Sequence, residues 1–272
     1  MIKDITIGQY FPGTSPIHKL DPRMKIVLTF IYIIFIFLCK NFIALGAMTL
    51  LLLVTVLISK ISPKLIAKSV KPIFLIVLIT SVLQILYNSD GTVLFEWKRL
   101  HITTGGIYMA IFTTVRIVVL VIASAMLTYT TSPTLLTDAI ERLFSPLKVV
   151  KINVHSIAMM MTIALRFIPT LIDEVDKIMS AQKSRGADFE TGSLINRGKA
   201  MIPIFIPLFI NSFRRAYELA FAMDCRCYQG GEGRTRLKVM KLAARDYVSI
   251  GILVLFCVGI IVSNHFLTAV IR

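Results

Sequence analysis

A series of long apolar runs constrains the fold of this chain more than any other feature. They are Ile26–Cys39, Phe42–Ile58, Pro72–Tyr87, Gly105–Thr130 and Tyr247–Leu267. About 17–25 apolar residues cross a bilayer core, where a helix satisfies its own backbone hydrogen bonds. Hydrophobic residues make up 56% of the chain, above the roughly 45–50% of soluble domains. We therefore predict an all-α integral membrane protein with about five transmembrane helices.

The excess of basic residues is explained by orientation in the membrane. The chain has 30 Lys and Arg residues against 15 Asp and Glu residues, a formal net charge of +15. These cations lie beside or between the apolar runs, so no nucleic acid partner is expected. Four precede the first run and four lie between the second and third, whereas the outer loops hold three. Because cytoplasmic loops are rich in Lys and Arg, we predict a multi-pass protein with a cytoplasmic amino terminus.

The region between the fourth and fifth runs combines apolar stripes with more than half of the basic residues. One pattern with helical spacing starts at Leu135, and another starts at Ile157 but is interrupted by Arg166 and Pro169. Helices that are half apolar and half charged lie along a boundary. We therefore predict long amphipathic cytoplasmic helices in this region.

The predicted organisation has three parts. Residues 1–130 form four spans, residues 131–245 form the cytoplasmic helical region, and residues 246–272 form the last span. In an alternative, residues 155–172 cross as a sixth span. That arrangement conflicts with the distribution of positive charge, because it puts the basic ends of the amphipathic helices outside.

The middle region contains a repeat. Phe167-Ile168-Pro169 leads through an amphipathic pattern to Ser184-Arg185-Gly186, and Phe205-Ile206-Pro207 leads through another to Cys225-Arg226-Cys227. Measured from the prolines, the two arms have lengths of about 24 and 28 Å at ~1.5 Å per residue. A duplicated helix with an arginine at each end favours a device that holds two similar partners.

The residues at these two ends are the candidate docking site. They are Ser184, Arg185, Gly186, Cys225, Arg226 and Cys227. An arginine offers a planar, charged fork for carboxylates and carbonyls, and small neighbours let it approach a facing surface. In the simpler interpretation, both arginines are ordinary cations at helix carboxyl termini, where they favour the negative end of the dipole.

Catalysis and metal binding are not expected. The chain has no phosphate-binding loop, no His-Glu-x-x-His pair and no nucleophile elbow, and its four histidines are scattered. Cys225 and Cys227 cannot complete a four-ligand metal site without further ligands nearby. We predict no catalytic residue, no metal and no cofactor of the chain's own.

A self-sufficient secondary carrier is an alternative, but it would normally place a carboxylate inside the membrane. None of the five apolar runs contains Asp or Glu. Arg116, in the middle of the fourth run, is the charged residue there. It is a candidate functional residue, or a structural arginine bonded to helix carbonyls.

The chain resembles the transmembrane T component of energy-coupling factor (ECF) transporters over nearly its whole length. The motifs that carry the resemblance are Gly8-Gln9-Tyr10-x-Pro12-Gly13-x-Ser15-Pro16-x-His18-x-Leu20-Asp21-Pro22-Arg23, Arg166-Phe167-Ile168-Pro169 and the two arginine motifs. In that family each arginine motif is usually Ala-Arg-Gly, so the arginines match here while several neighbours do not.

The resemblance implies a non-catalytic scaffold in a bacterial cell membrane. Two cytoplasmic ABC-type ATPase subunits, which bind and hydrolyse ATP, would dock on the arginine motifs of two coupling helices. A membrane-embedded substrate-binding S component would pack against the helical platform and carry a vitamin or another micronutrient. A subunit of a dedicated cobalt or nickel uptake system is the alternative within the same family.

Overall fold

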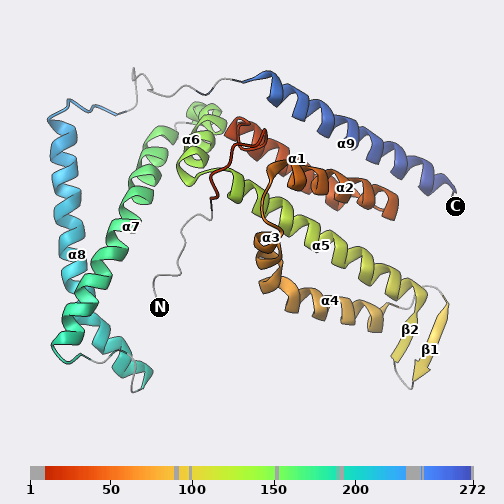
Figure 1. Ribbon diagram of the computed structural model, residues 1–272, viewed down its shortest axis with the longest axis horizontal. Coiled ribbons are helices and arrows are strands. Elements are labelled where there is room, and N and C mark those ends of the chain that lie inside the picture. Colours follow the sequence, from red (N-terminus) through yellow and green to blue (C-terminus); the bar gives the residue numbers. More distant parts are fainter. Residues whose placement is uncertain are drawn as a thin grey trace. The chain divides into compact units, whose positions relative to one another are not determined.

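The computed structural model describes residues 10–88, 92–97, 100–150, 153–187, 189, 193–230, 240 and 242–270. Gly8 and Gln9, named above for the family resemblance, lie outside this part. The elements are α1 Pro22–Leu38, α2 Phe42–Ser59, α3 Pro63–Val70, η1 Lys71–Ile73, α4 Phe74–Tyr87, β1 Val93–Trp97, β2 Leu100–Thr103, α5 Thr104–Thr130, α6 Pro133–Leu143, η2 Ser145–Val150, α7 Val154–Ser184, α8 Leu194–Asp224 and α9 Ala244–Val270 (Figure 1). The predicted helical membrane fold is confirmed, with one short antiparallel hairpin, β1–β2, added to it.

Local sequence signals explain where several helices begin. The Asp21 side chain accepts a hydrogen bond from the backbone N–H of Arg23, with Pro22 as the first residue of α1. Thr103 caps α5 in the same way through the N–H of Gly106. Asn153 caps α7 through the N–H of Ser156.

Five helical segments of the described chain have the length and composition of membrane spans. They are Phe42–Ser59, Pro63–Tyr87, Thr104–Thr130, Val154–Ser184 and Ala244–Asn264. The number agrees with the prediction, but the set differs. The apolar helix α1, at 17 residues, is not among them, whereas α7 is. The composition of α7 thus fits the alternative in which residues 155–172 cross the membrane.

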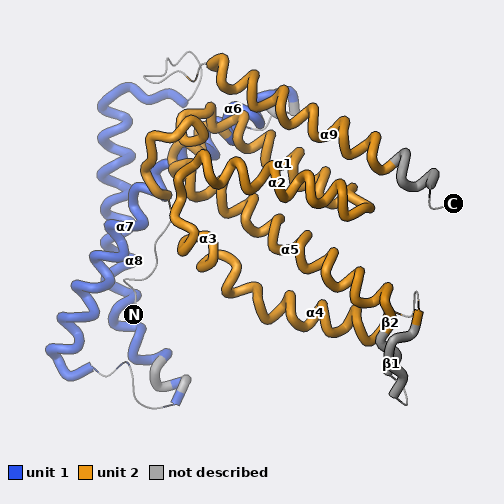
Figure 2. The backbone as a smooth tube through the Cα atoms, turned by 45° about the vertical axis from the view of Figure 1, so that its right-hand side comes forward, with its two compact units in different colours: residues 1–7, 140–239 blue, residues 8–139, 240–272 orange. Residues whose placement is uncertain are grey.

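The chain divides into two compact units (Figure 2). Residues 140–239 belong to unit 1, which contains α7 and α8, and residues 8–139 and 240–272 form unit 2. The core of unit 2 lies between α1, α2, α5 and α9, around the fully buried Ile36, Leu45, Met48 and Ile260. The buried Tyr32 hydroxyl donates to the Met48 carbonyl at 2.9 Å, so this polar group is satisfied inside the core.

The interruptions of the apolar pattern in α7 do not end the helix. Arg166 and Pro169 do not interrupt the helix, which is continuous over 31 residues, and α8 is likewise 31 residues long with Pro203 and Pro207 inside it. A proline removes one backbone N–H and bends a helix, but the hydrogen bonds on either side persist.

Candidate functional site

The carboxyl end of α7 places Arg185 at a helix cap. The N–H of Gly186 bonds to the Lys183 carbonyl at 2.9 Å, and the N–H of Ala187 bonds to the Gln182 carbonyl at 3.0 Å. Gly186 has φ +90°. This pair of bonds around a left-handed residue is the Schellman motif, in which Arg185 is the cap residue. The Arg185 side chain is exposed, as are those of its neighbours in the motif.

The end of α8 has the same hydrogen bonds. The N–H of Cys227 bonds to the Asp224 carbonyl at 2.9 Å, and the N–H of Tyr228 bonds to the Met223 carbonyl at 3.1 Å. Cys227 has φ +54°, the left-handed conformation that Gly186 adopts in α7. Arg226 is therefore the cap residue of a second Schellman motif, and it too is exposed.

The structure thus brings each group of predicted docking residues into one motif at a helix end. Ser184, Arg185 and Gly186 form one motif, and Cys225, Arg226 and Cys227 form the other. All six are exposed. The Ser184 hydroxyl donates to the Ser180 carbonyl at 3.1 Å, within its own helix. Small residues therefore surround each guanidinium without covering it.

Helices α7 and α8 pack against each other through a polar contact at Glu174. One Glu174 carboxylate oxygen accepts a hydrogen bond from the Asn211 amide at 2.6 Å, and the other lies 3.1 Å from Arg215. The Glu174 side chain is 13% exposed, whereas that of Arg215 is 40% exposed. The short amide contact is therefore the better shielded of the two, since solvent weakens exposed ion pairs.

This contact gives a second origin for the two arms, beside the predicted lengths of about 24 and 28 Å measured from the prolines. Glu174 lies eleven residues before Arg185, and Arg215 lies eleven residues before Arg226. At ~1.5 Å per residue, Arg185 lies about 16 Å beyond Glu174, and Arg226 lies about 16 Å beyond Arg215 and about 22 Å beyond Asn211. Figures 1 and 2 both show the helices crossing, with their carboxyl ends at opposite ends of the pair.

Arg116 takes part in the packing of unit 2. Its guanidinium donates to the Cys39 carbonyl, at the end of α1, with a distance of 2.7 Å, and lies 4.6 Å from the centre of the Phe112 ring. Its Nε is buried without a hydrogen-bond partner. These contacts fit the structural interpretation, in which the arginine satisfies a helix carbonyl and links α5 to α1.

The amino-terminal motif forms a polar cluster in unit 2. Asp246, 1% exposed at the start of α9, accepts a hydrogen bond from the N–H of Asp21 at 2.9 Å. Arg23 bridges the Asp21 carboxylate at 2.8 Å and the Met240 carbonyl at 3.3 Å. Lys25 donates to the Thr130 carbonyl at 2.8 Å. The motif thus ties the beginning of α1 to α5 and α9.

His18 and Gly13 close the same segment. The His18 ring contacts the Ser15 hydroxyl at 2.7 Å through Nδ1 and the Phe11 carbonyl at 3.1 Å through Nε2. A carbonyl only accepts, so Nε2 carries a proton and Nδ1 of the neutral ring accepts from Ser15. A Cβ at Gly13 would lie 2.6 Å from the ring, which explains the glycine. Desolvation lowers the pKa of His18, although the Phe11 carbonyl opposes this.

Sequence reasoning missed Asp246, because it considered that residue only as the flank of the last span. Its partner Asp21 is 225 residues away along the chain. The sequence signal that could have identified Asp246 is its place at the amino end of an apolar helix, where the positive end of the helix dipole stabilises a carboxylate.

Helix α8 presents a second surface, which is apolar. Phe205, Phe209 and Phe213 are exposed at four-residue spacing, and the rings of Phe209 and Phe213 lie 4.6 Å apart. Ile206 and Ile210 extend the same exposed surface. An exposed apolar patch of this extent is typical of a contact with another protein or with lipid.

No group of three or more metal-binding side chains occurs among the residues that the structure describes. Cys225 and Cys227 are exposed free thiols. Cys39 and Cys257 are buried in the core of unit 2.

Comparisons with known proteins identify the family. The family model CbiQ, described as "Cobalt transport protein", matches residues 13–237. The chain is 52% identical to the energy-coupling factor transporter transmembrane protein EcfT of Ruminiclostridium cellulolyticum, over 97% of this chain and 99% of that protein. It is 52% identical to EcfT of Clostridium kluyveri, over 96% and 97%, and 42% identical to EcfT of Bacillus subtilis, over 90% and 93%. The chain therefore belongs to the family of transmembrane components of energy-coupling factor transporters.

Proposed function

We propose that this chain couples two cytoplasmic ATPase subunits to a membrane-embedded substrate-binding S component, so that ATP hydrolysis drives micronutrient uptake. The observation that carries the proposal is the pair of exposed arginines, Arg185 and Arg226. They occupy the same position in two Schellman motifs, at the ends of two helices that pack together at Glu174. Two equivalent guanidinium groups suit two similar partners, because each presents the same fork of donors.

The mechanism follows from the way the two helices pack. ATP binds to the partner subunits, and this chain supplies no catalytic group or cofactor. When the ATPases approach or separate, each moves one arginine at the end of an arm of about 16 Å. Because Glu174 joins the arms near their crossing, motion at the tips changes the crossing angle. The apolar surface of α8 at Phe205, Phe209 and Phe213 then carries this motion to the S component.

The central experiment reverses the charge of both arginines. The double variant R185E/R226E should lose co-purification with the ATPases and lose transport, while its level in the membrane stays unchanged. Arg214→Glu is the matched control, since Arg214 is an exposed arginine in the body of α8, away from the cap. Intact complexes in the double variant, or equal losses in the control, would contradict the docking role.

The cytoplasmic location of these motifs has its own test. Cys225 and Cys227 are exposed beside Arg226, whereas Cys39 and Cys257 are buried. A thiol reagent that does not cross membranes should leave intact cells unlabelled and should label inside-out vesicles. A C225S/C227S variant should lose the labelling. Labelling of intact cells would place the arginine motifs outside and overturn the proposed orientation.

A further inference from the structure

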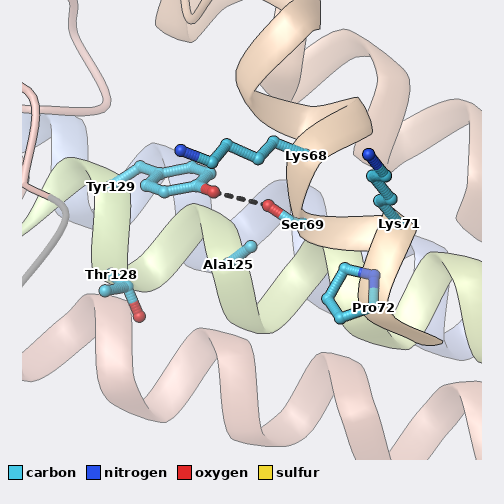
Figure 3. A pocket seen from close by; sticks show the side chains of 7 residues that line it. All are labelled: Lys68, Ser69, Lys71, Pro72, Ala125, Thr128 and Tyr129. Carbon is cyan, nitrogen blue, oxygen red and sulfur yellow. Dashed lines mark hydrogen bonds between the residues drawn. The ribbon is translucent and has the colours of Figure 1, made fainter. Parts of the chain in front are cut away.

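A hollow in unit 2 lies between α3 and the carboxyl-terminal half of α5 and has a volume of about 710 Å³. It is lined by Lys68, Ser69, Lys71, Pro72, Ala125, Thr128 and Tyr129 (Figure 3). Small-molecule sites commonly measure about 300–1,000 Å³, so this hollow has room for a lipid headgroup. None of these residues belongs to the arginine motifs or to the apolar surface of α8.

Hydrogen bonds hold the hollow in shape. The hydroxyl groups of Ser69 and Tyr129 bond to each other, as the dashed line in Figure 3 marks. Both also lie near the Leu65 carbonyl, Ser69 at 3.1 Å and Tyr129 at 3.3 Å. Tyr129 is 3% exposed. These two hydroxyl groups are occupied in fixing α3 against α5, so the polar groups that remain for a ligand are the two lysines and the exposed Thr128 hydroxyl.

Lys68 and Lys71 are both exposed and lie one turn apart. Figure 3 shows the Lys68 side chain extending toward Tyr129, and Lys71 on the other side of Ser69. In the described part of the chain neither ammonium group has a hydrogen-bond or ion-pair partner. No carboxylate lines the hollow, and Ala125 and Pro72 make part of its wall apolar. Two unneutralised cations beside an apolar wall suit an anion that also has an apolar part.

The location of the hollow indicates which kind of anion would bind there. Immediately after Lys71 and Pro72, the chain continues into the apolar α4, whose Phe74, Leu75 and Ile76 are exposed. Both lysines lie in the first part of the candidate span Pro63–Tyr87, just before its apolar part α4, at the depth where headgroups meet acyl chains. A soluble phosphate would use the cations but not the neighbouring apolar surface. A phospholipid uses both.

We propose that an anionic phospholipid places its phosphate headgroup between Lys68 and Lys71 and its acyl chain along the exposed apolar face of α4. A specific ion pair between an exposed lysine and the phosphate contributes about fivefold in affinity at most, so the two lysines together contribute about 25-fold. This inference does not depend on the docking role of the arginine motifs.

The test measures lipid binding to the purified full-length chain by native mass spectrometry. Dioleoylphosphatidylglycerol and dioleoylphosphatidylcholine are added in competition. The wild type should retain phosphatidylglycerol in preference, and K68Q/K71Q should bind it about 25-fold more weakly. The matched control is K60Q/K64Q, which removes the same charge from two exposed lysines outside the hollow and should leave the preference unchanged.

A second variant tests the hollow itself. Ala125→Leu fills part of it without changing charge and should also weaken binding of phosphatidylglycerol, with the thermal midpoint confirming that the variant is folded. Equal losses in K68Q/K71Q and K60Q/K64Q would overturn the proposal, because they would indicate general attraction of charge. Equal retention of both lipids by the wild type, or displacement of the lipid by excess inorganic phosphate, would overturn it as well.

Discussion

Cys227 occupies a backbone conformation that costs an L residue free energy, and its replacement tests the geometry of the second arginine motif. Its φ of +54° lies in the left-handed region, where a residue with a Cβ is about 1–2 kcal/mol less stable than in the right-handed region. Glycine avoids that cost but loses about 0.5–1 kcal/mol of extra chain entropy on ordering. Cys227→Gly should therefore stabilise the cap by about 0.5–1 kcal/mol.

Two further substitutions make the test directional. A Cβ added at Gly186, where φ is +90°, would meet no atom within 4 Å, so Gly186→Ala tests the backbone cost alone and should destabilise the first cap by about 1 kcal/mol. Cys225 lies two residues before Cys227 with φ −60°, so Cys225→Gly should destabilise the helix end by about 0.5–1 kcal/mol. The same replacement, Cys to Gly, is thus expected to stabilise the helix end at position 227 and to destabilise it at position 225.

The assay is amide hydrogen exchange of the purified protein, followed at the N–H groups of Ala187 and Tyr228, which close the two Schellman motifs. Exchange at Tyr228 should slow by about threefold to fivefold in Cys227→Gly, and exchange at Ala187 should quicken by about fivefold in Gly186→Ala. The reasoning would be refuted if exchange at Tyr228 were faster in Cys227→Gly, or if Cys227→Gly and Cys225→Gly changed the exchange rate in the same direction.

Three other predictions concern contacts away from the caps. Because burial lowers the pKa of His18 below its ordinary 6.5, protonation opposes folding, so stability should fall as the pH drops below about 6.5; thermal unfolding of His18→Gln should lack this dependence. Glu174→Ala should broaden the distribution of distances between spin labels at the carboxyl ends of α7 and α8. Glu174→Gln should broaden it less, because glutamine can still accept a hydrogen bond from the Asn211 amide. An unchanged distribution in both variants would contradict the role of this contact. Arg116→Met should lower the unfolding free energy by about 1–3 kcal/mol, because the Cys39 carbonyl loses its charged donor; a thermal midpoint equal to that of the wild type would argue against a structural role.

The helical membrane fold could be predicted because it depends on local composition. A run such as Phe42–Ile58 is apolar throughout, and in a bilayer a helix satisfies every backbone group along it, so the observed α2 at Phe42–Ser59 is nearly identical. The bounds of α7 could not be predicted in this way. Pro169 disfavours a helix locally, but neighbouring hydrogen bonds carry the helix through it.

The candidate site also has features that the sequence predicts and features that only the tertiary structure shows. Arg185 and Arg226 stand out in the sequence because each ends an amphipathic repeat, and the structure places each at a helix end. The left-handed conformation of Cys227 had no sequence signal, since cysteine is not a residue that favours it. The contact between α7 and α8 also required the structure, because Glu174 and Arg215 meet only when the two helices pack.

By itself, the sequence determined that this chain is a helical membrane protein with a duplicated, arginine-ended helix, because apolar periodicity and helix ends are properties of short segments. Only the tertiary structure decided that Asp246 receives the N–H of Asp21, that α7 and α8 join at Glu174, and that Lys68 and Lys71 border one hollow with Tyr129. Those contacts connect residues far apart along the chain. Their formation depends on how whole helices pack, which no local pattern specifies.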